Sequence, residues 1–200
     1  MWYAFGIYFN RALCAHIHSA FCILHFAFLW ASTTVNDHLP FYEVKAMELR
    51  LARKEDIPGI LLLLKQVGEV HHQLRPDIFP AGMRKYNAAA LEEILGDSHR
   101  PIFVAAEGDT VAGYCFCVEK TVVAHGELYI DDLCVDEHYR GSEVATSLYR
   151  HACDYAKEVG CAFVTLNVWQ GNGRAQRFYE KMGMTPRSVT MEMPVEDTKC

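Results

Sequence analysis

The stretch from Tyr139 to Ala152 combines a basic residue, small residues and the start of an amphipathic pattern. It reads YRGSEVATSLYRHA, and its segment Arg140–Ala145 leads into an expected helix, Ser142–Val159. Such a loop offers backbone N–H groups at the positive end of a helix, where a phosphate or pyrophosphate can bind. Glu143 places a carboxylate inside this segment. The stretch also fits an ordinary helix start, with Ser142 as the cap and Glu143 in the first turn.

The whole chain has the composition of an ordinary globular protein. Its 200 residues are enough for one domain with a buried core, and 51% of them are hydrophobic while 22% are charged. The formal net charge is −6, and the excess acid lies in residues 47–200, because the charges of residues 1–46 cancel. This balance argues against broad nucleic-acid binding and is compatible with cationic substrates.

The eight cysteines do not form a recognisable disulfide or metal pattern. No two of them have the C-x-x-C spacing of zinc or redox sites. We therefore expect free thiols in a reducing cytoplasm and no metal.

The N-terminal part contains a run of 20 residues without formal charge, residues 12–31. That length is enough for a membrane span, but three histidines and a serine interrupt the run. The opening residues also lack the positive region of a signal peptide. Because Met47 begins a strand followed by a helix start, we expect residues 1–46 to be a dispensable extension and residues 47–200 to form the domain. A membrane anchor and a cleaved or packed segment are the alternatives.

Periodicity and turn residues predict a defined order of elements in residues 47–200. The order is strand, two helices, three strands, helix, strand, helix, strand, which indicates an α/β (α+β) fold with a mixed, mostly antiparallel sheet flanked by helices. A loop, His71–Gly82, separates the first two helices, and Gly108-Asp109 predicts a hairpin. The expected strands are Glu48–Ala52, Ile102–Ala106, Val111–Val118, Leu128–Val135, Ala162–Trp169 and Ser188–Met193; the expected helices are Ile60–Val70, Tyr86–Leu95, Ser142–Val159 and Asn172–Met182.

Two motifs on these elements resemble those of the GNAT superfamily of acetyl-CoA-dependent N-acetyltransferases. The first is LYIDDLCVDEHYRGSEVA, in which Arg140 and Ala145 match the family's anchor positions and Glu143 stands where the family has a glycine. The second is NGRAQRFYEKMGM, residues 172–184, which has the family's Asn, Ala, Phe-Tyr and Gly spacing. The resemblance covers residues 47–200, including the order of strands and helices.

The resemblance implies that acetyl-CoA is the cosubstrate. Its pyrophosphate would bind the loop before the third helix, and its pantetheine arm would pair with the preceding strand. Tyr179 matches the family's general acid, a phenol that stays protonated at neutral pH and protonates the departing thiolate. The implied coenzyme-binding residues are Leu133, Cys134, Val135, Arg140, Gly141, Ser142, Glu143, Val144, Ala145 and Asn172.

A base must take a proton from the substrate ammonium or from the tetrahedral intermediate, because only a neutral amine attacks a thioester. In this family the base often lies on the strand that leads into the coenzyme loop, or acts through water. Alternation along that strand favours Asp131, and a bulge would exchange it for Asp132. Glu127 is the third candidate.

The loop between the first two helices is where such enzymes usually bind the acceptor. His71, His72, Arg75 and Asp77 lie in this expected loop, and Trp169 follows a later strand. A solvated loop is the alternative to substrate contact, and neighbouring histidines alone are not a metal ligand set. The expected substrate-binding residues are Glu127, His72, Arg75 and Trp169.

These features predict a cytoplasmic N-acetyltransferase that moves acetyl from acetyl-CoA to a primary amine by direct attack in a ternary complex. The expected acceptor is a small cationic amine or a protein amino group, and no nucleic-acid partner is expected. A homodimer is compatible with the sequence, as is membrane attachment through residues 12–31. The alternative is a non-catalytic acyl-CoA-binding or sensing protein on the same fold.

Overall fold

The computed structural model describes residues 46–193 and residue 195. The chain divides into two units, Met1–Tyr42 and Glu43–Cys200, and the described residues belong to the second. The uncharged run at residues 12–31 lies outside them, so the extension, the anchor and the boundary at residue 47 stay predictions. Within the described ranges, no helix is both long and apolar enough to cross a membrane.

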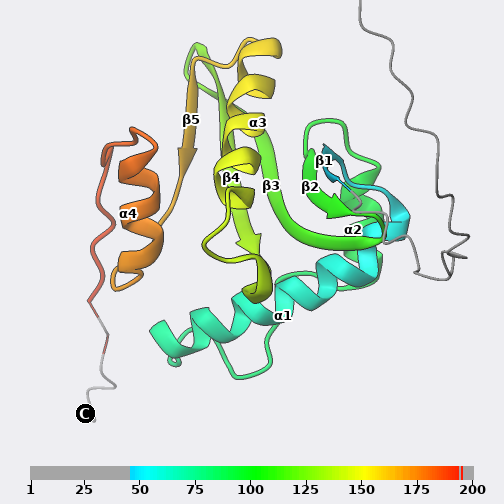
Figure 1. The fold of residues 1–200 in the computed structure, drawn as a ribbon. Coiled ribbons are helices and arrows are strands. Elements are labelled where there is room, and N and C mark those ends of the chain that lie inside the picture. Colours follow the sequence, from blue (N-terminus) through cyan, green and yellow to red (C-terminus); the bar gives the residue numbers. More distant parts are fainter. Residues whose placement is uncertain (1–45, 194, 196–200) are drawn as a thin grey trace, which may run out of the picture. The chain divides into compact units, whose positions relative to one another are not determined.

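The described residues form one five-stranded sheet with helices on both faces (Figure 1). The strand order is β1-β2-β3-β4-β5. The pairs β1–β2, β2–β3 and β3–β4 are antiparallel, and the pair β4–β5 is parallel. The elements are β1 (Met47–Leu51), the short 3-10 helix η1 (Lys54–Asp56), α1 (Ile57–Leu74), α2 (Ala88–Leu95), β2 (Ile102–Glu107), β3 (Thr110–Val122), β4 (His125–Val135), the short 3-10 helix η2 (Glu137–Tyr139), α3 (Val144–Glu158), β5 (Phe163–Leu166) and α4 (Gly173–Lys181). This arrangement confirms the predicted fold class.

The two faces of the sheet carry separate hydrophobic cores. One core joins α1 and α2 to the sheet through residues such as Ile60, Leu91 and Tyr114. The other joins α3 to the opposite face through residues such as Leu128 and Leu148, and side chains of α4 pack against its border. The side of β4 on which a residue projects therefore decides which helices it meets.

The predicted loop between the first helices begins too early. Helix α1 continues through Leu74, so His71 and His72 lie in its last turn. No glycine or proline lies between Gly68 and Pro76, and a proline disfavours helical geometry in the residue before it, here Arg75. Tyr86 is likewise outside α2, because Asn87 caps that helix by accepting a hydrogen bond from the Ala90 N–H group at 2.9 Å.

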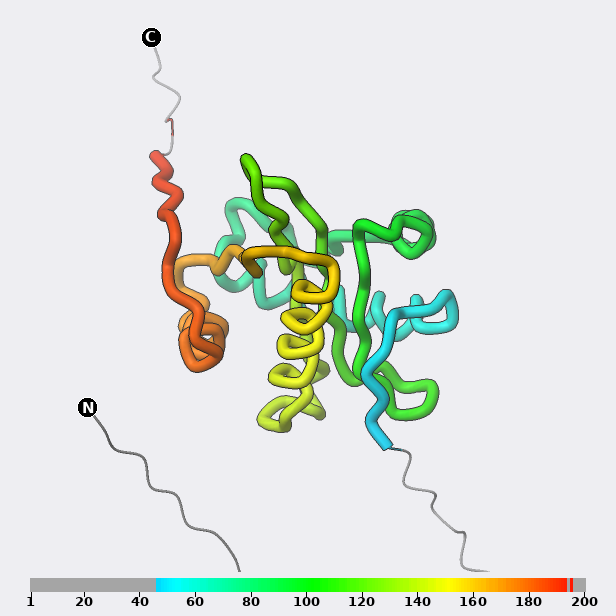
Figure 2. Tube along the Cα trace, turned by 90° about the horizontal axis from the view of Figure 1, so that it is seen from above, coloured from blue at the N-terminus to red at the C-terminus, as the bar shows by residue number. Residues whose placement is uncertain are grey.

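The predicted last strand, Ser188–Met193, is absent from the described part of the chain. Its alternating side chains point into solvent, with Val189 78% exposed and Met191 85% exposed. In Figure 2 the chain after α4, drawn in red, leads away from that helix. Residues 184–193 have no regular secondary structure. An alternating pattern gives a strand only where a neighbouring strand accepts its hydrogen bonds, and β5 has no second partner here.

The connection from β1 to α1 is held by a nearly buried ion pair. The guanidinium of Arg50 binds both carboxylate oxygens of Asp56, at 2.6 and 2.9 Å, and the Arg53 N–H group donates to the same carboxylate at 2.7 Å. We expect Asp56→Ala to lower the free energy of unfolding by about 3 kcal/mol, because the largely buried Arg50 would keep only its longer, 3.4 Å ion pair with the exposed Glu48. Chemical denaturation measures this loss.

An exposed ion pair on α3 provides the matched control. Asp154 and Lys157 are 2.7 Å apart, with both side chains more than half exposed. Asp154→Ala should cost less than about 1 kcal/mol. Equal losses in the two variants would show that the Arg50–Asp56 pair does not stabilise this connection.

Candidate active site

Strands β4 and β5 pair over only part of their length. Glu127–Ile130 pairs with Phe163–Leu166, whereas the following residues of β4 pair only with β3. Figure 1 shows the two strands separating toward their C-terminal ends. The edge of Leu133–Val135 that faces β5 therefore has no strand partner among the described residues, and an extended ligand can pair with it.

The loop Arg140–Ala145 opens α3 as the sequence predicts. Gly141 has a φ of +85° and open space where a side chain would stand, a conformation that favours glycine. The first backbone bond of the helix runs from the Ser147 N–H group to the Glu143 carbonyl at 2.8 Å. Within the described residues, the N–H groups of Gly141, Glu143 and Ala145 have no acceptor. They remain available to an anion at the positive end of the helix.

The residue at the N-cap position of α3 is Glu143, not Ser142 as the sequence suggested. The exposed side chain of Glu143 makes no capping hydrogen bond. The Ser142 hydroxyl donates to the Tyr139 carbonyl at 2.6 Å and accepts only a long bond, 3.4 Å, from the Val144 N–H group. The Arg140 side chain is exposed, and its Nε lies 3.4 Å from the Val135 carbonyl oxygen, beside the free edge of β4.

A bulge lies at the two adjacent aspartates of β4. Phe116 of β3 pairs with Asp132, but the next residue of β3, Cys117, pairs with Ile130, so Asp131 has no partner on β3. Both carboxylates bind tyrosines of the core beneath α1 and α2. The bulge therefore brings Asp131 and Asp132 to the same face, instead of leaving only one of them there.

The two carboxylates have different surroundings. The Asp131 carboxylate accepts a hydrogen bond from the Tyr86 hydroxyl at 2.8 Å and forms an ion pair with the Lys85 ammonium, also at 2.8 Å. Lys85 donates a hydrogen bond to the Asp131 backbone carbonyl at 3.0 Å as well. Asp132 accepts one hydrogen bond, from the Tyr114 hydroxyl at 2.9 Å. Burial raises the pKa of Asp132 to about 6, despite the opposing charge of Lys85. Asp132 is thus ionised at neutral pH, and unlike Asp131 it forms no ion pair with a described residue.

Tyr179 is held on α4 against aromatic side chains. Its ring lies 5.1 Å from the Phe178 ring and 6.2 Å from the Tyr149 ring of α3. Burial raises the pKa of Tyr179 well above its ordinary range, and the nearby Cys115 and Asp132 raise it further. Its hydroxyl has no hydrogen-bond partner in the part of the chain described, so at neutral pH it holds a proton that it can donate to a ligand.

Asn172 caps α4, as its position in the second motif suggests. Its side-chain oxygen accepts a hydrogen bond from the Ala175 N–H group at 3.1 Å. The amide nitrogen of Asn172 makes no hydrogen bond to a described residue and can still bind a coenzyme.

The chain after α1 packs against the loop that follows β5. The Phe79 and Trp169 rings meet edge to face at 5.2 Å, and the Arg75 guanidinium lies 5.7 Å from the centre of the Trp169 ring. Arg75 also binds Asp77 and Glu192, both at 2.6 Å. These contacts place Arg75 and Trp169 together in one cluster, but Arg75 already forms ion pairs with two carboxylates.

His72 and Glu127, also expected to bind substrate, have their polar groups bound within the protein. The Nδ1 atom of His72 lies 2.7 Å from the Phe79 carbonyl oxygen. Glu127 is buried and accepts hydrogen bonds from Thr165 at 2.8 Å and Arg187 at 2.6 Å. The hydrogen bond from Thr165, together with Arg187, lowers the pKa of Glu127 despite burial. Glu127 is therefore a weaker proton acceptor than Asp132.

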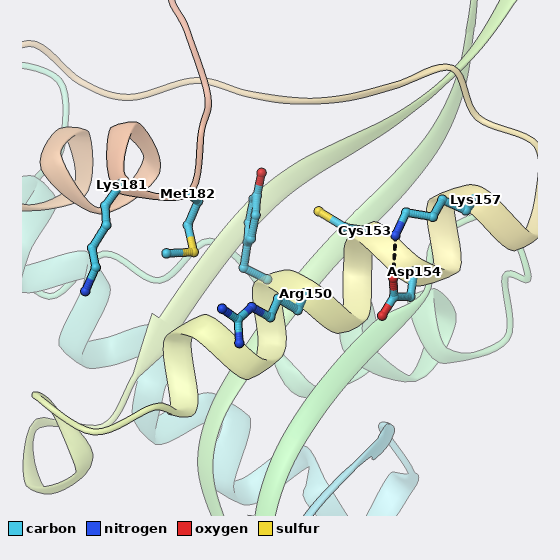
Figure 3. A pocket seen from close by; sticks show the side chains of 7 residues that line it. Arg150, Cys153, Asp154, Lys157, Lys181 and Met182 are labelled. Carbon is cyan, nitrogen blue, oxygen red and sulfur yellow. Dashed lines mark hydrogen bonds and ion pairs between the residues drawn. The ribbon is translucent and has the colours of Figure 1, made fainter. Parts of the chain in front are cut away.

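A hollow that the sequence did not indicate lies between α3 and α4 (Figure 3). Its volume is about 470 Å³, and Figure 3 shows Arg150 and Lys181 extending from the two helices toward the open space between them. Lys157 also lines it but is paired with Asp154 at 2.7 Å. The polar stripe of Arg150, Asp154 and Lys157 at helical spacing was the available signal, although such a stripe usually marks only a solvated face. The complete lining is Tyr149, Arg150, Cys153, Asp154, Lys157, Lys181 and Met182.

The described cysteines and acidic residues give no sign of a metal site. No group of three or more histidine, cysteine or carboxylate side chains is placed to hold a metal ion in the described ranges. The five described cysteines are free thiols, and those of β3 and β4 are buried.

Residues 67–184, more than half of the chain, match the model of the Acetyltransferase (GNAT) family. The chain belongs to the GNAT family. This GNAT protein is 25% identical over 146 residues to thialysine N-epsilon-acetyltransferase from Bos taurus, which covers 68% of the chain and 82% of the relative. It is 33% identical over 106 residues to glucosamine 6-phosphate N-acetyltransferase from Arabidopsis thaliana, which covers 50% and 69%.

Solved structures agree with this assignment. A mutant of the BH1408 protein from Bacillus halodurans superimposes with a TM-score of 0.69 at 28% identity, covering 74% of the GNAT protein and 99% of the solved chain. Coverage of the curated relatives varies more widely, from 44% to 82% of their own length, and is 62% for one relative from Bacillus subtilis (strain 168). The family and the names of these relatives support an acyltransferase.

Proposed function

We propose that this GNAT protein transfers acetyl from acetyl-CoA to a primary amine by direct attack in a ternary complex. The observation that carries the proposal is the divergence of β4 from β5, which leaves the edge Leu133–Val135 without a strand partner. The free N–H groups at the start of α3 follow β4 along the chain, and Tyr179 lies on α4, which follows β5. Two relatives whose names specify N-acetylation of an amine support the reaction type. The free thiols fit a cytoplasmic location.

The chain offers two kinds of contact to the coenzyme. The N–H groups of Gly141, Glu143 and Ala145 bind the pyrophosphate, with Arg140 able to add a charged contact. The open edge of β4 pairs with the pantetheine arm, which positions the thioester next to α4. Bound there, acetyl-CoA supplies the acyl group, and the residues of the chain orient it and move protons.

Asp132 and Tyr179 carry the proton transfers in this proposal. Asp132 accepts a proton from the amine as the new C–N bond forms, which Asp131, expected from alternation, is less able to do because Lys85 and Tyr86 bind it. Tyr179 donates its proton to the thiolate released when the C–S bond breaks. The proton balance closes when Asp132 later releases its proton to solvent and Tyr179 takes one up.

Glu143 should weaken coenzyme binding. At about 6 Å from a phosphate, its carboxylate costs roughly 0.7 kcal/mol in water-like surroundings and roughly 3 kcal/mol at an effective dielectric constant near 20. Because the side chain is exposed, we expect a value toward the lower end and a several-fold lower Kd for acetyl-CoA in Glu143→Gly. Calorimetric titration measures the change, and an unchanged or higher Kd would contradict a phosphate at this loop.

A two-stage experiment tests the proposed function. Thermal denaturation of the full chain is followed with increasing acetyl-CoA, and thiol release is then measured with a panel of amines. A rise in Tm with coenzyme and amine-dependent thiol release are expected. A rise in Tm without thiol release for any amine would instead favour the non-catalytic acyl-CoA-binding protein.

A further inference from the structure

A second hollow lies beside the segment that leads into α2. Its volume is about 560 Å³. Lys85 and Tyr86 form part of its wall, and both also bind Asp131, the neighbour of Asp132 in the bulge. These two side chains therefore link the hollow to the bulge, although Asp132 itself is outside the lining. Its lining consists of Leu61, Gly82, Arg84, Lys85, Tyr86, Asn87, Ala88 and Ala90.

The lining of this hollow is basic. It contains Arg84 and Lys85 and no acidic residue. Lys85 neutralises Asp131, at 2.8 Å, while its own side chain stays 40% exposed. Arg84 is exposed and forms no ion pair with a described residue. A ligand in the hollow thus meets one uncompensated positive charge.

Three carboxylates considered above, Asp77, Glu127 and Glu192, are already paired. Arg187 binds Glu127 at 2.6 Å, and Arg75 binds both Asp77 and Glu192 at 2.6 Å. A diamine or polyamine would need an unpaired carboxylate for its second ammonium group, or would have to break one of these pairs. The net acidity of the chain, which favours a cationic acceptor, therefore does not describe the charges next to Asp132.

We infer that the amine acceptor carries an anionic group, a carboxylate or a phosphate, which binds in this hollow against Arg84 while its amine lies at Asp132. The inference rests on the proposed function and specifies its substrate class. Guanidinium groups bind both carboxylates and phosphates through paired N–H donors. Lys85 assists by neutralising Asp131, which would otherwise repel the anion.

Matched pairs of amines test this inference. L-Lysine and cadaverine differ by one carboxylate, and glucosamine 6-phosphate and glucosamine differ by one phosphate. With the full chain and acetyl-CoA, we expect kcat/KM to be at least about tenfold higher for the acidic member of one pair, the usual effect of one charged contact. The pair that shows the preference distinguishes a carboxylate acceptor from a phosphate acceptor.

Variants of the hollow assign the preference to Arg84. Arg84→Gln should bring the ratio of the two kcat/KM values within each pair close to one, and Arg84→Glu should reverse the preference. The kcat/KM for the member without the acidic group should change by less than about threefold. Lys65→Gln, which removes an exposed charge of α1 outside this lining, should leave the ratio unchanged. Binding of the same amines to the protein saturated with coenzyme A, measured by calorimetry, gives the preference without turnover.

The outcomes separate this inference from the proposed function. Equal binding and equal kcat/KM within both pairs, a preference for cadaverine or glucosamine, or a preference unaffected by Arg84→Gln would each overturn the inference. Absence of transfer to any amine would contradict the proposed function, and in that case the binding ratios alone still decide the inference.

Discussion

Replacing Tyr179 by phenylalanine is expected to lower kcat for acetyl transfer by about 10²- to 10³-fold, with little change in the Kd for acetyl-CoA. The ring contacts with Phe178 and Tyr149 remain, so the variant loses the hydroxyl and keeps the packing. Without the hydroxyl, the departing thiolate has no acid placed beside it, and a positioned acid contributes a factor of this size. Single-turnover measurement of thiol release gives the rate directly.

Tyr149→Phe is the matched control for that variant. Tyr149 contacts the rings of Phe178 and Tyr179 but is buried in the hydrophobic core between α3 and the sheet. Burial raises the pKa of its phenol to about 12. Its loss of a hydroxyl should change kcat by less than about threefold. A Tyr179→Phe protein that retained more than about a third of the wild-type kcat would remove Tyr179 from the proton transfer.

The second large effect is expected at Asp132. Because burial raises the pKa of this carboxyl to about 6, it is ionised above pH 6 and protonated below it. A base must be ionised to act, so the plot of log kcat/KM against pH should bend downward as the pH falls through 6. Below the bend the slope should be one unit steeper than above it. Asp132→Asn should lower kcat/KM by about 10²- to 10³-fold at neutral pH and abolish this bend.

Asp131→Asn provides the comparison for the base. It removes the partner of Lys85 but leaves the Tyr114–Asp132 hydrogen bond, so kcat/KM should fall by less than about fivefold and the bend should remain. With Asp131 neutral, a repulsive charge beside Asp132 is lost, and the bend should move to slightly lower pH. A bend that disappears in Asp131→Asn but persists in Asp132→Asn would make Asp131 the base.

The parts of this fold that could be predicted are those fixed by local signals. Gly108 and Asp109 predicted the β2–β3 hairpin, and Gly108 has the expected positive φ of 60°. The loop before α3 and the Asn172 cap were predictable because helix starts depend on a few adjacent residues. That these two helix starts bind one coenzyme is a prediction from the family motifs.

The features that could not be predicted depend on contacts between distant segments. The bulge that brings Asp131 and Asp132 to one face is a property of the pairing between β3 and β4, which the sequence of β4 alone does not specify. The ion pair between Lys85 and Asp131 joins a loop to a strand 46 residues later, and it decides which carboxylate is free. The strand expected at Ser188–Met193 failed for the converse reason, since its alternation has no neighbour to pair with.

The charge of the acceptor could not be predicted from the sequence either, because it also depends on contacts between distant segments. Net charge counts every carboxylate equally, whereas the structure pairs Glu127, Asp131 and Glu192 with cations and leaves Arg84 without a described partner. The substrate class proposed above therefore follows from which charges are paired in the structure, and not from the net charge of the chain.

The most direct test of the central claim is to measure both products of one reaction. The full chain is incubated with acetyl-CoA and each amine of the two matched pairs, and free coenzyme A thiol and N-acetylated amine are quantified together by mass spectrometry. We predict that the two products appear in a one-to-one ratio and that both disappear in the Tyr179→Phe, Asp132→Asn double variant. Thiol release without acetylated amine, or equal product from the double variant, would contradict acetyl transfer at this site.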